Sequence, residues 1–263
     1  MSAAIIDLQA WLQSPPGRYM LAWERAQIDL AVADIFGFHA MQLGLPQLDA
    51  LAANRMQHRW LATNTAVAGA HFVTDFAALP FSANSLDLVV MPHSLELTDD
   101  PHTALREVER VLVPEGRVVI CGLNPASLWA LRMRRARLLH RLGVGQNFLP
   151  AGQQFIGFWR LRDWLRLLGF EVEVARFGCY RPALQNEKWF DRLLPMENAG
   201  QRWWPIFGAV YFLVAVKRVR GMTLHSPAWK TTRPLVSAPV SVAGYAGPVR
   251  SSDKFNLNSR NVD

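Results

Sequence analysis

Two ionisable side chains, His93 and Glu96, follow closely on an apolar run at residues 86–91 that is predicted to be a strand. The ordinary pKa of histidine lies near neutrality, so His93 is the candidate general base for a proton transfer. The alternative is that His93 and Glu96 only cap or position their loop. Asp75 is a second candidate, because its carboxylate could accept a hydrogen bond from a ligand or merely cap its own loop.

Other kinds of chemistry find less support among the residues. The two cysteines, Cys121 and Cys179, are too few for a disulfide framework or a four-thiolate zinc site. Cys121 falls in a predicted buried strand, where a free thiol commonly serves only packing. The seven histidines show no ligand-like spacing to one another or to cysteine, and we predict no metal site.

The net charge of +7 on 263 residues is concentrated in one segment. Residues 116–162 contain no Asp or Glu, and they hold eight arginines: Arg117, Arg132, Arg134, Arg135, Arg137, Arg141, Arg160 and Arg162. Leucines recur at helical spacing over about 126–142 with arginines on another side, which predicts a basic amphipathic helix.

Three interpretations of this helix compete. It could pack on the core with a solvated basic face, form a lid that attracts an anionic or acyl-carrier-bound substrate, or dock to an anionic membrane surface through Arg132–Arg141. We do not expect nucleic acid as a partner, because no stacking motif or recognition-helix pattern accompanies the charge.

The predicted elements that must position these residues alternate along the chain. Helical patterns occupy about 18–36, 48–56, 100–112, 126–142 and 158–168, and strand patterns occupy about 39–43, 58–63, 70–73, 86–91, 117–121, 170–177 and 210–219. This alternation predicts an α/β fold with a doubly wound, mainly parallel sheet, and the last two strands predict an antiparallel C-terminal hairpin at its edge. Ligands of such sheets bind beyond the carboxyl ends of the strands, which draws attention to the loops after Leu43, Val73, Met91 and Cys121.

One contiguous block carries a family resemblance. Residues 74–90 are TDFAALPFSANSLDLVV, and residues 101–116 are PHTALREVERVLVPEG. In order and spacing this resembles the class I S-adenosylmethionine-dependent methyltransferases of the type 11 small-molecule kind, over about residues 38–180. The segments SPPG at 14–17 and NPASLW at 124–129 are similar to the uncharacterised YafS-like branch of that family.

The resemblance implies a Rossmann-like fold, S-adenosylmethionine as cofactor, and methyl transfer to a small molecule. It implies that Asp75 accepts a hydrogen bond from the adenine amino group and that Phe76 presents its backbone N–H to the adenine ring. Gly44 and Leu45 would form the first strand-to-helix turn beside the cofactor. Met91 and Pro92 would line its methionine end, which places His93 near the transferred methyl group.

The chain also departs from the family pattern. The first motif has a single glycine, Gly44, and the place of the ribose-binding acid is taken by Thr63-Asn64. These departures motivate an alternative function: a non-catalytic methyltransferase-like binding or scaffold protein, peripheral to the membrane.

The predicted domain spans residues 1–220, with the basic helical insertion at about 124–157. Residues 221–263 are rich in Ser, Thr, Pro, Gly and Asn, which predicts a disordered tail. The first residues lack the pattern of a signal peptide, and the longest apolar run (203–216) is shorter than the ~20 residues that a spanning helix needs. We therefore expect a cytoplasmic protein.

Overall fold

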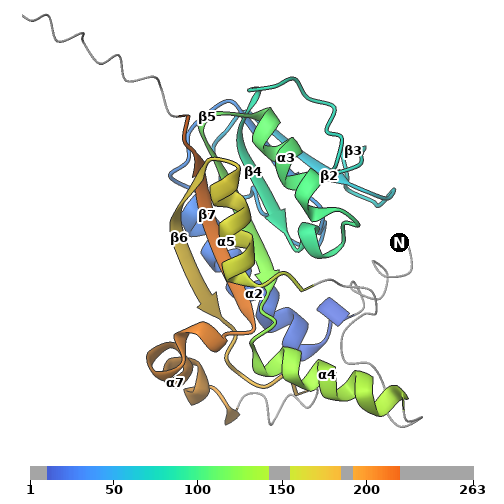
Figure 1. Cartoon of the computed structure of the whole chain (residues 1–263), viewed down its shortest axis with the longest axis vertical. Helices are drawn as coiled ribbons and strands as arrows, with labels where there is room; N and C mark the ends of the chain where they lie inside the picture. The colour runs from blue at the N-terminus through green and yellow to red at the C-terminus, as the bar shows by residue number, and fades with distance from the viewer. Residues whose placement is uncertain (1–10, 142–154, 185–191, 220–263) are drawn as a thin grey trace, which may run out of the picture. The chain divides into compact units, whose positions relative to one another are not determined.

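The computed structural model describes residues 11–141, 155–184 and 192–219, and its centre is one seven-stranded sheet in the order β3-β2-β1-β4-β5-β7-β6 (Figure 1). The strands are β1 (His39–Leu43), β2 (His58–Thr63), β3 (Phe72–Val73), β4 (Leu86–Pro92), β5 (Leu112–Leu123), β6 (Phe170–Gly178) and β7 (Val210–Lys217). Strands β1 to β5 pair in parallel, whereas β7 lies antiparallel between β5 and β6. The predicted α/β fold, with its antiparallel edge, is confirmed.

Five α-helices and two short 3-10 helices accompany the sheet in the described residues. They are α2 (Pro15–Val32), η1 (Ser94–Glu96), α3 (Pro101–Val111), α4 (Leu128–Arg141), α5 (Phe158–Leu167), α7 (Pro195–Trp203) and η2 (Pro205–Phe207). The predicted start of α3 is confirmed, because the Asp100 carboxylate accepts hydrogen bonds from the backbone N–H groups of His102 and Thr103, both at 3.1 Å. The predicted helix at 126–142 is α4.

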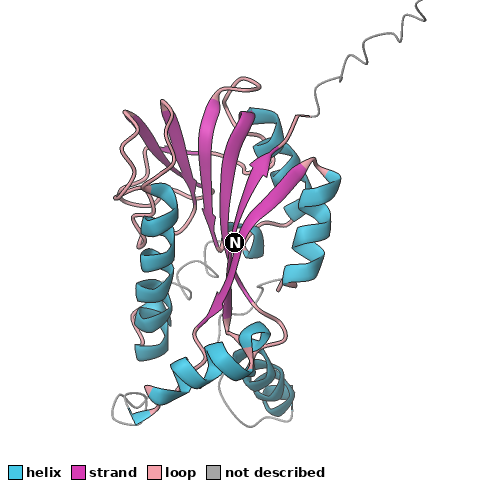
Figure 2. Ribbon diagram, turned by 90° about the vertical axis from the view of Figure 1, so that its left-hand side faces the viewer, coloured by secondary structure: helices cyan, strands magenta, loops and turns pink. Residues whose placement is uncertain are grey.

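The helices cover both faces of the sheet (Figure 2). Alternate residues of a strand point to opposite faces, so Val90 packs in one apolar cluster and Val89 in the other. The first cluster includes Ile28 of α2, and the second includes Leu105 of α3 and Leu161 of α5. This arrangement is the doubly wound one that the sequence predicts.

The predicted helix at 48–56 is wrong, since the connection from β1 to β2 consists of turns, bends and irregular loop. Two buried amide side chains hold this connection in place of helical hydrogen bonds. Asn54 donates to the carbonyls of Val32 (2.8 Å) and Ile35 (3.1 Å) at the end of α2, and it accepts from the Met56 N–H at 2.9 Å. Gln42 of β1 makes similar bonds to the turn that follows the strand.

The sequence patterns also missed α7 and η2, which lie between β6 and β7. Residues 220–263, which include the predicted tail, fall outside the described residues, as does part of the predicted insertion (142–154). None of the described helices combines the length and the apolar character that crossing a membrane requires.

Candidate functional site

The turn after β1 contains the single glycine of the first motif. Gly44 and Leu45 both have positive φ angles, 74° and 42°, so the chain reverses direction sharply here. A Cβ atom on Gly44 would lie 3.1 Å from Oγ of Ser94 and 3.7 Å from Cζ of Phe76. Glycine is therefore required both by the backbone conformation and by the close approach of the β3 and β4 loops.

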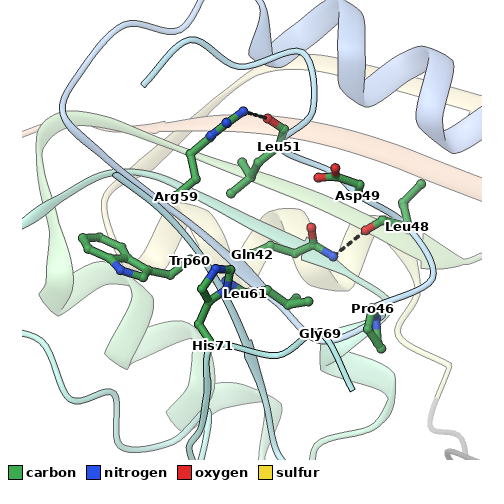
Figure 3. A pocket seen from close by; sticks show the side chains of 10 residues that line it. All are labelled: Gln42, Pro46, Leu48, Asp49, Leu51, Arg59, Trp60, Leu61, Gly69 and His71. Atoms are coloured by element: carbon green, nitrogen blue, oxygen red, sulfur yellow. Dashed lines mark hydrogen bonds between the residues drawn. The ribbon is translucent and has the colours of Figure 1, made fainter. Parts of the chain in front are cut away.

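The side chain of Gln42 holds this turn from within the sheet edge. Its Nε2 donates to the carbonyls of Gly44 (3.1 Å), Leu45 (3.0 Å) and Leu48 (2.7 Å), and its Oε1 accepts from the Ala50 N–H at 2.9 Å. Figure 3 shows the amide reaching Leu48 across the base of the connection. One buried amide thus satisfies backbone groups that a helix would otherwise have paired.

The loop after β3 carries Asp75 and Phe76. Asp75 is exposed, and its Oδ1 accepts a hydrogen bond from the Ala77 N–H at 2.9 Å, whereas Phe76 is buried. The Asp75 carboxylate therefore both caps its loop and faces solvent.

A pair on α3 holds the Leu-Pro-Phe turn that follows. Arg110 donates to the carbonyls of Phe81 (2.9 Å) and Leu79 (3.1 Å), and Glu107 accepts from the Leu79 N–H at 3.1 Å. The two side chains also pair with each other at 2.8 Å, and the hydrogen bond from Arg110 lowers the pKa of Glu107. The pair therefore fixes the loop that carries Asp75 to α3.

The loop after β4 begins with a buried charge cluster formed by Glu24, His93 and Glu96. Nε2 of His93 lies 2.6 Å from Oε1 of Glu24, and Nδ1 lies 3.0 Å from Oε2 of Glu96. The three side chains are 0%, 2% and 3% exposed, in the order Glu24, His93, Glu96. The second oxygen of Glu96 accepts from the Leu123 N–H at the end of β5, so the cluster joins α2, β4 and β5.

The two carboxylates decide the charge of the imidazole. Burial by itself lowers the pKa of His93, but the charges and hydrogen bonds of Glu24 and Glu96 outweigh that effect and raise its pKa well above the ordinary value. A protonated ring donates from both nitrogens and has no lone pair with which to accept a further proton. The general-base role stays a prediction, and it would require one carboxylate to withdraw.

His93 also has a left-handed backbone conformation, with φ at 55°. Such a conformation is uncommon for a residue other than glycine and is held here by the two ring contacts. It turns the chain into η1, where the Ser94 hydroxyl donates to the Leu43 carbonyl at the end of β1. The cluster therefore positions the β4 loop against the Gly44 turn. Within the described part of the chain no group of three or more His, Cys, Asp or Glu could hold a metal ion.

Two cavities meet at Phe76 on the carboxyl edge of the sheet. The larger, about 460 Å³, is lined by Asn64, residues 73–77 and residues 97–100. The smaller, about 20 Å³, lies between residues 44–47 and the β2–β3 connection at 63–67. Asn64, Phe76 and Leu97 line both.

A further cavity, about 390 Å³, lies beside β1 and β2, where the connections from β1 to β2 and from β2 to β3 contain no helix (Figure 3). Gln42, Arg59, Trp60 and His71 are among its lining residues. It lies between the β1–β2 and β2–β3 connections, and none of the residues with a predicted site role lines it.

The structure brings Gly44, Leu45, Asp75 and Phe76 together around the first two cavities. Met91 and Pro92, predicted to line the same site, are buried at the end of β4 and line neither cavity.

Sequence reasoning did not single out Asn64 or Leu97 as lining residues, or Glu24 as the partner of His93. Glu24 had a signal. It stands four residues from both Met20 and Ile28, on the buried side of α2, where an acid needs a partner.

Comparisons with known proteins point to one family. The model of the methyltransferase domain family matches residues 39–120. The uncharacterized protein YafS of Escherichia coli K12 is 30% identical over 241 residues, which are 90% of this chain and 92% of its own length. The malonyl-[acyl-carrier protein] O-methyltransferase of Halorhodospira halophila is 37% identical over 87 residues, 30% of each chain.

Solved structures support the fold. An S-adenosylmethionine-dependent methyltransferase from Archaeoglobus fulgidus has a TM-score of 0.52 at 17% identity, over 75% of this chain and 94% of its own. Another from Thermotoga maritima has a TM-score of 0.52 at 16% identity, over 76% of this chain and 92% of its own. Taken with the match of the family model and the near full-length relative, these findings show that the chain belongs to the class I S-adenosylmethionine-dependent methyltransferase family.

Proposed function

We propose that this chain binds S-adenosylmethionine at the carboxyl edge of β1 to β4 and catalyses methyl transfer to a small anionic or lipid-like acceptor. The observation that carries the proposal is the meeting of two cavities at Phe76, lined by Gly44, Leu45 and Asp75 from separate loops. These are the positions to which the family pattern assigns cofactor contacts.

The residues fit the adenosine end of the cofactor. Asp75 lines the larger cavity and is exposed, so its free oxygen can accept a hydrogen bond from the adenine amino group. Asn64 lines both cavities and stands where the family has an acid, so its side-chain oxygen would serve as a neutral acceptor for ribose hydroxyls. A neutral acceptor makes a weaker hydrogen bond than a carboxylate, and we expect correspondingly modest affinity.

The part of the site that would hold the methionine end of the cofactor is narrower. The cavity beside Gly44 holds about 20 Å³, which is room for about one water molecule. Cofactor binding would therefore require residues 45–47 and 64–67 to separate. Both stretches consist of turns and bends without a helix, which supports a movement of this kind.

When bound, S-adenosylmethionine supplies a sulfonium methyl group that a suitable nucleophile can accept. The contribution of the protein would then be mainly to hold the acceptor in line and to exclude water, so catalysis does not depend on a free base at His93. The basic helix α4 follows the carboxyl end of β5 and exposes Arg134 and Arg135, which supports an anionic acceptor.

A thermal shift measurement with S-adenosylmethionine and with its demethylated product tests the proposal. A ligand at ~100 times its dissociation constant adds ~2.7 kcal/mol, which raises the Tm of a domain of this size by several degrees. Asp75→Ala should weaken the shift at a given ligand concentration. Asp163→Ala, at an exposed position on α5, is the matched control and should behave as wild type.

The absence of a shift with either compound at millimolar concentrations would overturn the proposal and favour a non-catalytic role. An equal shift for wild type and Asp75→Ala would show that a ligand binds but that the proposed adenine contact is wrong.

A further inference from the structure

Seven consecutive exposed residues, 201–207, form the last turn of α7, the link after it and η2, and are called the α7–η2 run. Four of them carry large apolar side chains: Trp203, Trp204, Ile206 and Phe207 are 72%, 54%, 46% and 53% exposed. Single exposed apolar residues are ordinary on protein surfaces, but a contiguous group of this kind marks an interaction surface.

The run is held firmly from its inner side. The Tyr180 hydroxyl donates to the Pro205 carbonyl at 2.7 Å, and the Asn124 side chain donates to the carbonyls of Ile206 (2.7 Å) and Gly208 (2.9 Å). The ring of Tyr180 also lies against Gly200 so closely that a Cβ atom there would be 2.3 Å from Cγ of the tyrosine. The backbone is thus satisfied toward the protein, and the apolar side chains are left on the outside.

The basic helix α4 begins beside this run. Asn124, which holds residues 206 and 208, also accepts a hydrogen bond from the Ala126 N–H at 3.1 Å just before α4. Trp129 and Met133 are buried on the inner side of α4, whereas Leu128 and Leu131 are 51% and 62% exposed. Both views of the molecule place α4 and α7 at the same lower end (Figures 1 and 2).

The charge of this end is strongly positive. Arg134 and Arg135 of α4 and Arg202 of α7 are exposed, and none of the three has a carboxylate partner among the ion pairs of the described residues. No Asp or Glu occurs from residue 116 to residue 162. The surface therefore combines exposed tryptophans with unneutralised arginines.

We propose that α4 and the α7–η2 run form a docking surface for an anionic membrane. Tryptophan favours the boundary between headgroups and acyl chains, where its ring is apolar and its N–H remains hydrated. Arginines around such a group attract anionic headgroups, and a basic amphipathic helix with exposed leucines inserts in the plane of the same boundary. A lipid surface accepts scattered apolar side chains without a matching shape, whereas a protein partner would need carboxylates to face three arginines.

The surface adjoins the carboxyl edge of the sheet, since α4 follows the end of β5 and η2 precedes the start of the antiparallel β7. The two cavities at Phe76 open on that same edge, at the ends of β1 to β3. Docking would bring this edge toward the bilayer. The inference stands on exposure and charge, and it does not depend on methyl transfer.

Co-sedimentation of the full chain with lipid vesicles tests the inference. One set of vesicles contains phosphatidylcholine alone, and the other contains phosphatidylcholine with phosphatidylglycerol. We expect binding to the anionic vesicles at low salt, with at least about tenfold weaker binding to the neutral ones and at ~1 M salt, where charges are screened beyond ~3 Å.

Two double variants separate the apolar and the basic contributions. Trp203→Ser with Trp204→Ser, and Arg134→Gln with Arg135→Gln, should each weaken binding to anionic vesicles by about tenfold or more. The matched control is Phe36→Ser with Arg55→Gln. It removes one exposed apolar and one exposed basic side chain just before β1 and β2, at the amino ends of these strands and so away from the carboxyl ends. It should bind as wild type does.

Three results would overturn the inference: no binding to anionic vesicles at low salt, equal binding to neutral vesicles, or wild-type binding by both test variants. If the chain instead self-associates in solution, ignores vesicles, and loses the association in Trp203→Ser with Trp204→Ser, the surface is a contact between copies of this chain and not a membrane contact.

Discussion

Replacing Glu24 by glutamine should destabilise the protein far more than the same replacement at an exposed position. The glutamine has nearly the same size as the glutamate, so packing around α2 is retained and no cavity forms. What is lost is the negative charge 2.6 Å from Nε2 of His93, in a site where both side chains are at most 2% exposed. The imidazolium then keeps Glu96 as its only charged partner in the buried cluster, because the glutamine oxygen can accept from Nε2 only as a neutral group.

The expected magnitude is about 2–3 kcal/mol. A hydrogen bond to a charged group contributes about 1.5–3 kcal/mol, and complete burial places this one near the upper end. The full 3–5 kcal/mol cost of breaking a buried pair is not expected, because Glu96 still balances the charge of His93. One oxygen of Glu24 is buried without a hydrogen-bond partner in the described structure, so the glutamine amide that replaces it gains no compensating bond there. A loss of this size lowers the Tm by about 4–12 °C in a domain of 150–250 residues.

Urea unfolding, followed by far-ultraviolet circular dichroism at pH 7, measures the loss directly. The matched control is Glu171→Gln, at the exposed start of β6, where the pair with Arg218 is exposed to solvent and contributes about 0–1 kcal/mol. If Glu24→Gln and Glu171→Gln unfold at the same urea concentration, the cluster does not stabilise the fold and the reasoning is refuted.

Three further predictions concern the same edge of the sheet. The raised pKa of His93 means that the folded state holds a proton which the unfolded state releases above about pH 6.5. The stabilisation from this proton is complete below that pH and declines by up to about 1.4 kcal/mol per pH unit as pH rises through the folded pKa. Denaturant unfolding from pH 5 to 10 measures the decline, which should be absent in His93→Gln. Gln42→Leu should cost about 3 kcal/mol or more, because four hydrogen bonds to buried backbone groups are lost, and an unchanged unfolding midpoint would contradict the role given to this amide. Gly44→Ala should cost about 1–2 kcal/mol for its left-handed conformation alone and should weaken S-adenosylmethionine binding, which calorimetric titration against wild type would check.

The strands and most helices were predictable because their signals are local. The apolar patterns at 39–43, 58–63 and 86–91 became β1, β2 and β4 with bounds within one residue. The Asp100-Pro101 start of α3 was equally local, since the capping carboxylate bonds to N–H groups two and three residues away.

The predictions that failed or were missed share one cause, which is that contacts with residues distant in the sequence override or add to the local pattern. The pattern at 48–56 suits a helix, but Gln42 on β1 and Asn54, bonded to the end of α2, bind the backbone in turns instead. The role of Glu24 depends on a histidine 69 residues away in sequence, which no local pattern reveals. The exposure of residues 201–207 was hidden for the same reason, because whether an apolar side chain is covered depends on elements far away in the sequence.

The class of fold, the family, and the choice of Gly44, Asp75 and His93 as candidate site residues followed from the amino-acid sequence, since each rests on local periodicity or on a contiguous motif. The surroundings of those residues depended on the tertiary structure. It surrounded His93 with two carboxylates, and it joined Gly44, Asn64 and Asp75 around the cavities at Phe76. It also left Trp203 and Trp204, at the end of α7, exposed at the end of the molecule where α4 lies. Charge, proximity and exposure are properties of groups far apart along the chain, and they come into being only when the sheet brings those groups together.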